Sequence, residues 1–323
     1  MGLFGNIGRK KGQAPQGQAP AAPDQKPKRR GPSLSTIIIV VLILGGSAIV
    51  AYPSFADWWN SYHQSRAIAS YVSKVEETDP AVLQEMLDDA HAYNQRLLSK
   101  SNRFMPSESE IEEYERLLDI TGDGIMGYVQ VARLGINYPI YHGVEERILQ
   151  IAIGHIIGSS LPVGGSNTHA AISGHRGLPS ARLFTDLDKM VEGDTFTITV
   201  FKETLTYEVD QIRIVEPSDM TDLNIDEGKD FVTLVTCTPY GVNTHRLLVR
   251  GHRIPNITGT AAIPPGAVQI PNYVAVPAVG VPMLFVYLVG TLIYYHFKDK
   301  GYDRDKVMAE LNELKDRDRN NAA

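Results

Sequence analysis

The stretch TLVTCTPYGVNTHRLLVRGHR, residues 233–253, predicts a β-hairpin that contains the single cysteine of the chain. Its two apolar runs are typical of strands, and TPYGVNT between them turns the chain. We centre the turn between Gly241 and Val242. Cys237 then lies opposite Arg246, with the two side chains on one face about 5 Å apart. A guanidinium at that place favours a nucleophilic thiolate and offers a fork of donors to an oxyanion. The same geometry also fits an arginine that merely covers a buried thiol.

The lone thiol itself has two interpretations. Cys237 is the only cysteine in 323 residues, which excludes an intramolecular disulfide and any zinc site built from cysteine pairs. Free cysteine is among the most buried residue types, so one interpretation is a small buried apolar side chain. The other is a nucleophile, which needs an acid/base partner, most often histidine.

Among the nine histidines, placement favours His175 as that partner. It follows the apolar run HAAIS in the glycine-flanked loop SGHRGLPSARLF, where a side chain can reach an open site. His245 neighbours Arg246, and alternation along a strand turns it to the opposite face. No pair of histidines has the usual zinc-ligand spacing, so we expect neither a metal nor another cofactor.

Short β-like runs, broken by Gly, Pro, Asn and Asp, begin at Ile125. The predicted strands lie near 127–132, 137–141, 169–173, 195–200, 204–217, 231–237 and 246–254. Many short strands at this spacing favour a closed barrel or a sandwich of about 130 residues. Helices are predicted upstream, over 57–77, 80–99 and 108–118. Asp79 and Pro80 suit the N-cap and first position of the second helix.

Two apolar runs flank this region, Ser35–Tyr52 and Val276–Phe297. Each is about long enough to cross a bilayer at 1.5 Å per residue. Basic residues precede the first run and follow the second, which predicts two spans, cytoplasmic termini and an external middle. The alternatives are a buried core helix for either run and a cleavable signal peptide for the first.

The predicted organisation therefore has seven parts. They are a disordered basic tail (1–34), a transmembrane helix (35–53), an extracellular helical region (54–124), a β-domain (125–255), a Pro/Gly linker (256–275), a transmembrane helix (276–297) and a cytoplasmic tail (298–323). The formal net charge is −6, and residues 36–296 hold 17 basic and 29 acidic side chains. This acidic middle argues against nucleic acid as a partner, because phosphate binding needs a basic surface.

Two segments of the β-domain resemble a known family. SLPVGGSNTHAAISGHRGLPSARLFTDLDKM and TLVTCTPYGVNTHRLLVRGHRIP are similar to the sortases, above all to the class C sortases that assemble pili. The resemblance covers roughly residues 110–255 and extends to the topology with two anchors. It implies a closed antiparallel β-barrel with N-terminal helices, in which Cys237 is the nucleophile, His175 the general acid/base and Arg246 the oxyanion or backbone ligand.

The resemblance also implies a reaction and partners. Sortases cleave an L-P-x-T-G-like signal between Thr and Gly, hold the Thr carbonyl as a thioester and pass it to an amine. In class C the acceptor is a lysine of the next pilin. Two alternatives stay open: attachment of surface proteins to peptidoglycan, and a catalytically silent membrane protein that binds sorting signals.

One segment departs from the class C pattern. Class C sortases carry a lid with an Asp-Pro-aromatic motif before the barrel, whereas this chain has SKSNRFMPSE at 99–108. Arg103, Phe104 and Met105 are the lid candidates, with Phe104 as a possible plug over the thiol. The alternative is an ordinary loop between two helices.

Overall fold

The computed structural model describes residues 34–256, 280, 283–292, 306, 308–317 and 319. It divides into two units, Met1–Gly45 and Gly46–Ala323, and each is considered by itself. The predicted tail over 1–34 and the predicted linker over 256–275 lie outside the described residues, apart from Leu34 and Asn256.

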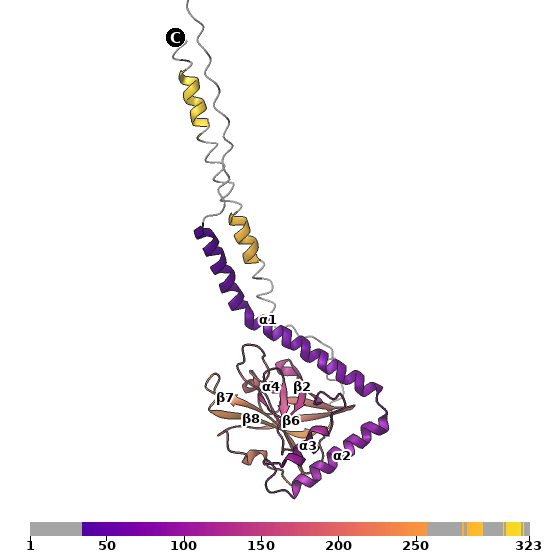
Figure 1. The fold of residues 1–323 in the computed structure, drawn as a ribbon. Coiled ribbons are helices and arrows are strands. Elements are labelled where there is room, and N and C mark those ends of the chain that lie inside the picture. The colour runs from indigo at the N-terminus through magenta and orange to yellow at the C-terminus, as the bar shows by residue number, and fades with distance from the viewer. Residues whose placement is uncertain are drawn as a thin grey trace, which may run out of the picture. The chain divides into compact units, whose positions relative to one another are not determined.

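Eight strands form a closed barrel in the order β1-β2-β3-β4-β7-β8-β6-β5 (Figure 1). They are β1 Ile125–Val131, β2 Ile136–His142, β3 Ile153–His155, β4 Thr168–Ser173, β5 Thr195–Val200, β6 Glu203–Val215, β7 Asp230–Thr238 and β8 His245–Ile254. Pairing between β1 and β5 closes the ring. All seven predicted strands are present within a few residues of their expected positions.

The barrel is mixed, so the expectation of an antiparallel barrel is wrong in this respect. Two of the eight pairings are parallel, β2 with β3 and β4 with β7. A parallel pair needs a crossover instead of a hairpin. The short helix α4, Glu146–Leu149, lies in the first crossover, and β5 and β6 lie in the second. The sequence also gave no sign of β3, because three residues are too few to show alternation.

The register predicted for the hairpin is confirmed. Strands β7 and β8 pair antiparallel, with Cys237 opposite Arg246 and Val235 opposite Leu248. The turn contains Gly241 with φ of 75° and Asn243 with φ of 60°. These left-handed conformations suit the two residue types that tolerate them best.

The other elements are helical. They are α1 Leu34–Glu77, α2 Pro80–Leu98, α3 Glu108–Arg116 and the 3₁₀ turns η1 Ala132–Leu134, η2 Leu187–Lys189 and η3 Thr221–Leu223. As predicted, the side chain of Asp79 caps α2 by accepting a hydrogen bond from the Ala81 N–H at 2.8 Å.

Helix α1 includes both the first predicted span, 35–53, and the helix predicted over 57–77. It continues through Pro53, where the sequence predicted the first span to end. Its portion Ile37–Glu77 is the one helix among the described residues that is long and apolar enough to cross a membrane, with a mean hydropathy of 2.3 over an 18-residue stretch. A shorter apolar helix covers Met283–Leu292. Apart from Gly280, the remainder of the second predicted span lies outside the described residues, so that span stays a prediction.

The second half of α1 packs on the barrel. Ile68, Tyr71 and Val75 recur on one face and are buried in the main core. The Tyr71 hydroxyl donates to the Met126 carbonyl at 3.1 Å and accepts from the Phe201 N–H at 2.8 Å. These contacts join the helix to β1 and to the turn between β5 and β6.

Candidate active site

Strands β4 and β7 lie side by side and end at the same edge of the barrel. They pair in parallel as far as Ser173 opposite Val235. Beyond the end of β4 the Gly174 N–H donates to the Val235 carbonyl at 3.0 Å. The Thr236 hydroxyl donates a hydrogen bond to the Gly174 carbonyl at 2.7 Å. The loop after β4 therefore stays in register with the last residues of β7.

This register brings the predicted histidine next to the predicted nucleophile. One residue after His175, the Arg176 guanidinium donates to the Thr238 hydroxyl at 3.2 Å. His175 therefore has neighbours on both sides, Gly174 and Arg176, that contact residues on both sides of Cys237. Cys237 is the next-to-last residue of β7, and His175 lies two residues after the end of the neighbouring parallel strand β4. The hairpin alone could not reveal this arrangement.

Arg246 lies across the hairpin from Cys237 and keeps its donors available. Cys237 is a free thiol and is partly exposed. The half-buried Arg246 guanidinium donates to the His245 carbonyl at 3.2 Å and pairs with no carboxylate in the described part of the chain. By contrast, Arg250 on the same strand is fixed by Asp210 through two bonds of 3.0 and 3.1 Å. Arg246 is thus the β8 arginine that lies opposite the thiol, and no carboxylate among the described residues holds its guanidinium.

The His175 imidazole has an acidic neighbour that the sequence did not reveal. Its Nε2 atom is buried, finds no hydrogen-bond partner among the described residues, and lies 3.7 Å from Glu146 Oε2. Glu146 begins α4 and is largely exposed, so nothing in its sequence context distinguishes it from other surface glutamates. Its carboxylate is therefore placed to contact the His175 ring.

Contacts with Phe184 fix the backbone at His175. Its carbonyl accepts a hydrogen bond from the Phe184 N–H at 3.1 Å. A Cβ at Gly174 would lie 2.8 Å from the Phe184 ring, so only glycine permits this close packing. The Phe184 side chain is fully buried and lies under the loop that carries the imidazole.

Two other histidines of the barrel have structural roles. His155 accepts from the Tyr114 hydroxyl at 2.9 Å, and His169 donates to the Asn224 carbonyl at 2.7 Å while Thr233 bonds its other nitrogen at 2.7 Å. Burial lowers the pKa of each imidazole to about 4, so both are neutral near pH 7.

The lid candidates contact two loops of the barrel. The Arg103 guanidinium donates to the Leu223 carbonyl at 2.7 Å and stacks over the Phe104 ring at 4.8 Å. The Arg103 carbonyl packs on Gly158, where a Cβ would lie only 2.2 Å away and where φ is +88°. Met105 is 74% exposed. The segment therefore bridges the β3–β4 and β6–β7 loops.

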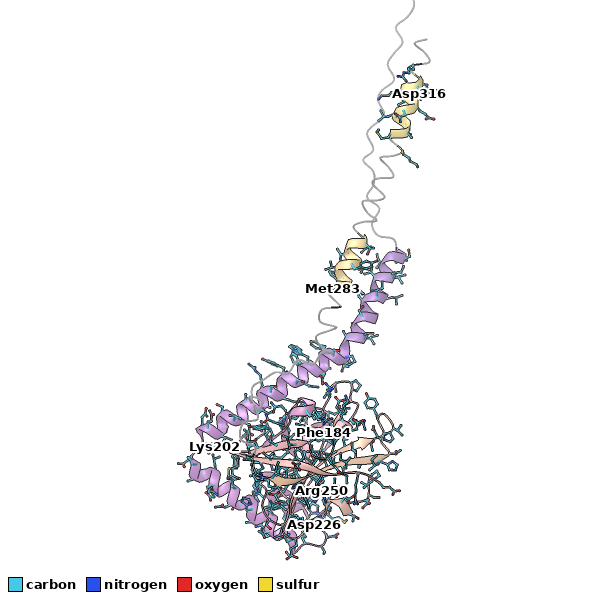
Figure 2. The ribbon with its side chains drawn as sticks, turned by 180° about the vertical axis from the view of Figure 1, so that it is seen from behind. Phe184, Lys202, Asp226, Arg250, Met283 and Asp316 are labelled. Carbon is cyan, nitrogen blue, oxygen red and sulfur yellow. The ribbon has the colours of Figure 1, made fainter. Side chains whose placement is uncertain are left out.

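The Leu223 anchor lies far from the thiol. Asn224, the residue after Leu223, accepts a hydrogen bond from His169 through its carbonyl. His169 pairs with Phe231, which is the second residue of β7, whereas Cys237 is the eighth residue of that strand. Six residues of strand span about 20 Å. Figure 2 shows Asp226, from the same loop, and Phe184, from the loop of His175, well apart on the barrel. A plug by Phe104 over Cys237 stays a prediction.

One cavity of the barrel domain lies apart from this site. A cavity of about 410 Å³ is lined by Tyr114, His142 and Glu145 among others, and it includes none of the three predicted catalytic residues. Among the residues that the structure describes, no three His, Cys, Asp or Glu side chains are grouped so as to hold a metal ion.

Comparison with known proteins gives one consistent result. A family model described as the sortase domain matches residues 129–254. The crystal structure of sortase C1 from Streptococcus agalactiae is 50% identical and covers 59% of this chain and 100% of its own, with a TM-score of 0.58. Sortase C from Clostridium perfringens, in a structure with the C-terminal cell wall sorting motif, is 37% identical and covers 59% of this chain and 99% of its own, with a TM-score of 0.53.

A curated relative is more distant. Sortase D of Bacillus subtilis is 24% identical over 131 residues, which are 40% of this chain and 63% of that protein. The chain thus spans less than two thirds of that relative. Three findings agree: the sortase domain model, the class C sortase structures that match over their own full length, and the arrangement of Cys237, His175 and Arg246. The chain belongs to the sortase family of cysteine transpeptidases.

Proposed function

We propose that this protein joins pilin subunits by transpeptidation. It would cleave an L-P-x-T-G-like sorting signal between Thr and Gly and transfer the new Thr carbonyl to a lysine amine of the next pilin. The observation that carries the proposal is the convergence of Cys237, His175 and Arg246 at the ends of β7, β4 and β8. The likeness to class C sortases, one of them in a structure with a sorting motif, supports the choice of substrate.

The first half-reaction forms a thioester. The Cys237 thiolate attacks the Thr carbonyl carbon, and negative charge moves to the carbonyl oxygen. The Arg246 guanidinium, which has no carboxylate partner among the described residues, would stabilise that oxyanion. His175, as imidazolium, gives its proton to the Gly nitrogen as the C–N bond breaks. The Gly fragment leaves as an amine, and the Thr carbonyl stays on sulfur.

The second half-reaction reverses these roles. The lysine ε-amine attacks the thioester carbonyl, His175 accepts a proton from that nitrogen, and the thiolate leaves. The product is an isopeptide bond between Thr and Lys, and the thiolate–imidazolium pair is restored. Glu146 supports the charged imidazole in both halves through the 3.7 Å contact.

The proposed setting is the outer face of a cell membrane. Helix α1 supplies an apolar segment of sufficient length. The second span and the cytoplasmic location of both termini rest on the apolar run Val276–Phe297 and on its basic flank.

We also propose that residues 100–107 act as a lid over the part of the barrel where the far end of a bound sorting signal would lie. Arg103 bridges the β3–β4 and β6–β7 loops about 20 Å from Cys237. An extended pentapeptide is about 17 Å long. A pentapeptide laid along β4 and β7 from the thiol would therefore end close to this segment.

The test uses the full chain in detergent with an L-P-x-T-G peptide. One arm adds a lysine-bearing pilin fragment, a second adds a peptidoglycan-type amine, and a third adds water only. Mass spectrometry should detect a thioester on Cys237 and an isopeptide product in the first arm. Product in the second arm alone would favour cell-wall anchoring. No thioester with the wild type, under conditions where Cys237 can be alkylated, would refute the proposal.

A further inference from the structure

Helix α1 presents a polar strip of side chains to the catalytic loops of the barrel. Asp57, Asn60 and Gln64 are spaced three and four residues apart and therefore share one face. Farther along, the same face is apolar and meets the core through Ile68 and Tyr71. Asp57 and Gln64 are each only 6% exposed. Burying polar groups is costly unless they are hydrogen-bonded, so the partners of this strip are informative.

Two of these residues hold the loop of His175. Asp57 Oδ1 accepts a hydrogen bond from the Arg182 N–H at 2.7 Å. Asn60 Nδ2 donates to the Ser180 carbonyl at 2.7 Å. Both bonds go to backbone atoms, so they fix the path of the loop whatever its side chains are.

The restraint reaches the imidazole through one intermediate residue. Phe184 lies two positions after Arg182, and its N–H donates to the His175 carbonyl at 3.1 Å. Its ring packs against Gly174, the residue before His175. The segment between β4 and η2 has no regular secondary structure, so contacts with a rigid helix take over the positioning that a sheet would otherwise provide.

The third residue acts on the acidic partner of the histidine. Gln64 Nε2 donates to the Ile151 carbonyl, and the Ile151 N–H donates to the Ile148 carbonyl of α4 at 3.0 Å. This short helix begins at Glu146, whose carboxylate lies 3.7 Å from His175 Nε2. One face of α1 therefore restrains both segments that meet at the imidazole.

We propose that Asp57, Asn60 and Gln64 are positioning residues for His175, supplied by the stretch of α1 that follows its apolar half. The proposal rests on the proposed role of His175 as proton donor and acceptor. A misplacement of about 1 Å at a catalytic group can lower a rate by about a hundredfold. Cys237 and Arg246 lie on paired strands and do not depend on the strip. Loss of the strip should therefore slow the chemical steps and leave peptide binding intact.

The experiment measures kcat and KM of the full chain in detergent, with the L-P-x-T-G peptide and a lysine acceptor. Asp57→Ala and Asn60→Ala should each lower kcat by about tenfold to a hundredfold, with KM within about twofold of wild type. Asp57→Asn keeps an oxygen that can accept from the Arg182 N–H, and it should restore most of the rate. Ser73→Ala, which alters an exposed contact on the same helix, is the matched control.

Each outcome decides a separate question. Wild-type kcat in Asp57→Ala and Asn60→Ala refutes the positioning role, and so does a loss in Asp57→Asn as large as in Asp57→Ala. If Asp57→Ala does not fold, Asn60→Ala and Asp57→Asn decide, because each leaves the buried Asp57 site filled. Failure of wild-type protein to form any thioester refutes the proposed function instead.

Discussion

Lowering the pH from 7.5 to 5.0 should destabilise this protein by about 4 kcal/mol through two buried histidines. His155 and His169 have a folded-state pKa of about 4, against an ordinary value of 6.5. The unfolded chain therefore binds more protons than the native state between these values. Stability from this source is present above pH 6.5 and is lost as the pH falls toward 4.

The magnitude follows from the two pKa values. One unit of difference is worth about 1.36 kcal/mol, so the full loss per histidine is about 3 kcal/mol below pH 4. At pH 5.0 the unfolded imidazole is almost fully protonated and the native one about one-tenth protonated. The loss at that point is about 2 kcal/mol for each histidine. Small domains are stable by about 5–15 kcal/mol, so this change is large enough to measure.

Urea unfolding of the full chain in detergent, at pH 7.5 and 5.0, tests the reasoning. Wild type should lose about 4 kcal/mol between the two conditions, and His169→Gln only about 2 kcal/mol, because one titrating group is gone. His91→Gln, on the exposed face of α2, should behave as wild type. If His169→Gln loses as much as wild type, the buried imidazole is not the source of the pH dependence.

Four further outcomes are expected. Cys237→Ala should abolish cleavage and the thioester seen by mass spectrometry, at a stability change on the order of 1 kcal/mol; any residual cleavage removes the thiol from the mechanism. Arg246→Lys keeps the charge but loses the planar fork, so kcat should fall by about a hundredfold; a wild-type rate would show that the fork is not needed. Gly158→Ala places a methyl 2.2 Å from the Arg103 carbonyl and should expose residues 100–107 to limited proteolysis; an unchanged digestion pattern would mean that the segment is not held there. A reporter fused after Ala323 should be cytoplasmic, and an external reporter would argue against a second span.

The hairpin was the easiest part of the site to predict. Its pairing is local, and one turn fixes the register of both strands, so the position of Cys237 opposite Arg246 follows from counting. The strand at 169–173 was also predictable, because its apolar run is compact. The parallel partnership of that strand with β7 was not, since nothing local records which distant strand lies beside it.

The groups around His175 were beyond sequence reasoning for a related reason. Glu146 and the polar strip of α1 look like ordinary solvated residues, because their partners are backbone atoms or a side chain far along the chain. Likewise, the sequence predicted that the first span ends at Pro53, but the helix continues through that residue. Only the tertiary arrangement distinguishes these residues from their neighbours.

The bond between Asp57 and Arg182 has a consequence for the order of events during synthesis. Its partners are 125 residues apart in the chain. A ribosome that adds about 5–20 residues per second needs about 6–25 seconds to deliver the second partner after the first. Contacts of such long range also tend to form slowly. The nascent enzyme would therefore have its anchor helix made well before its catalytic loop can be seated, and it would acquire activity only in a late step of maturation.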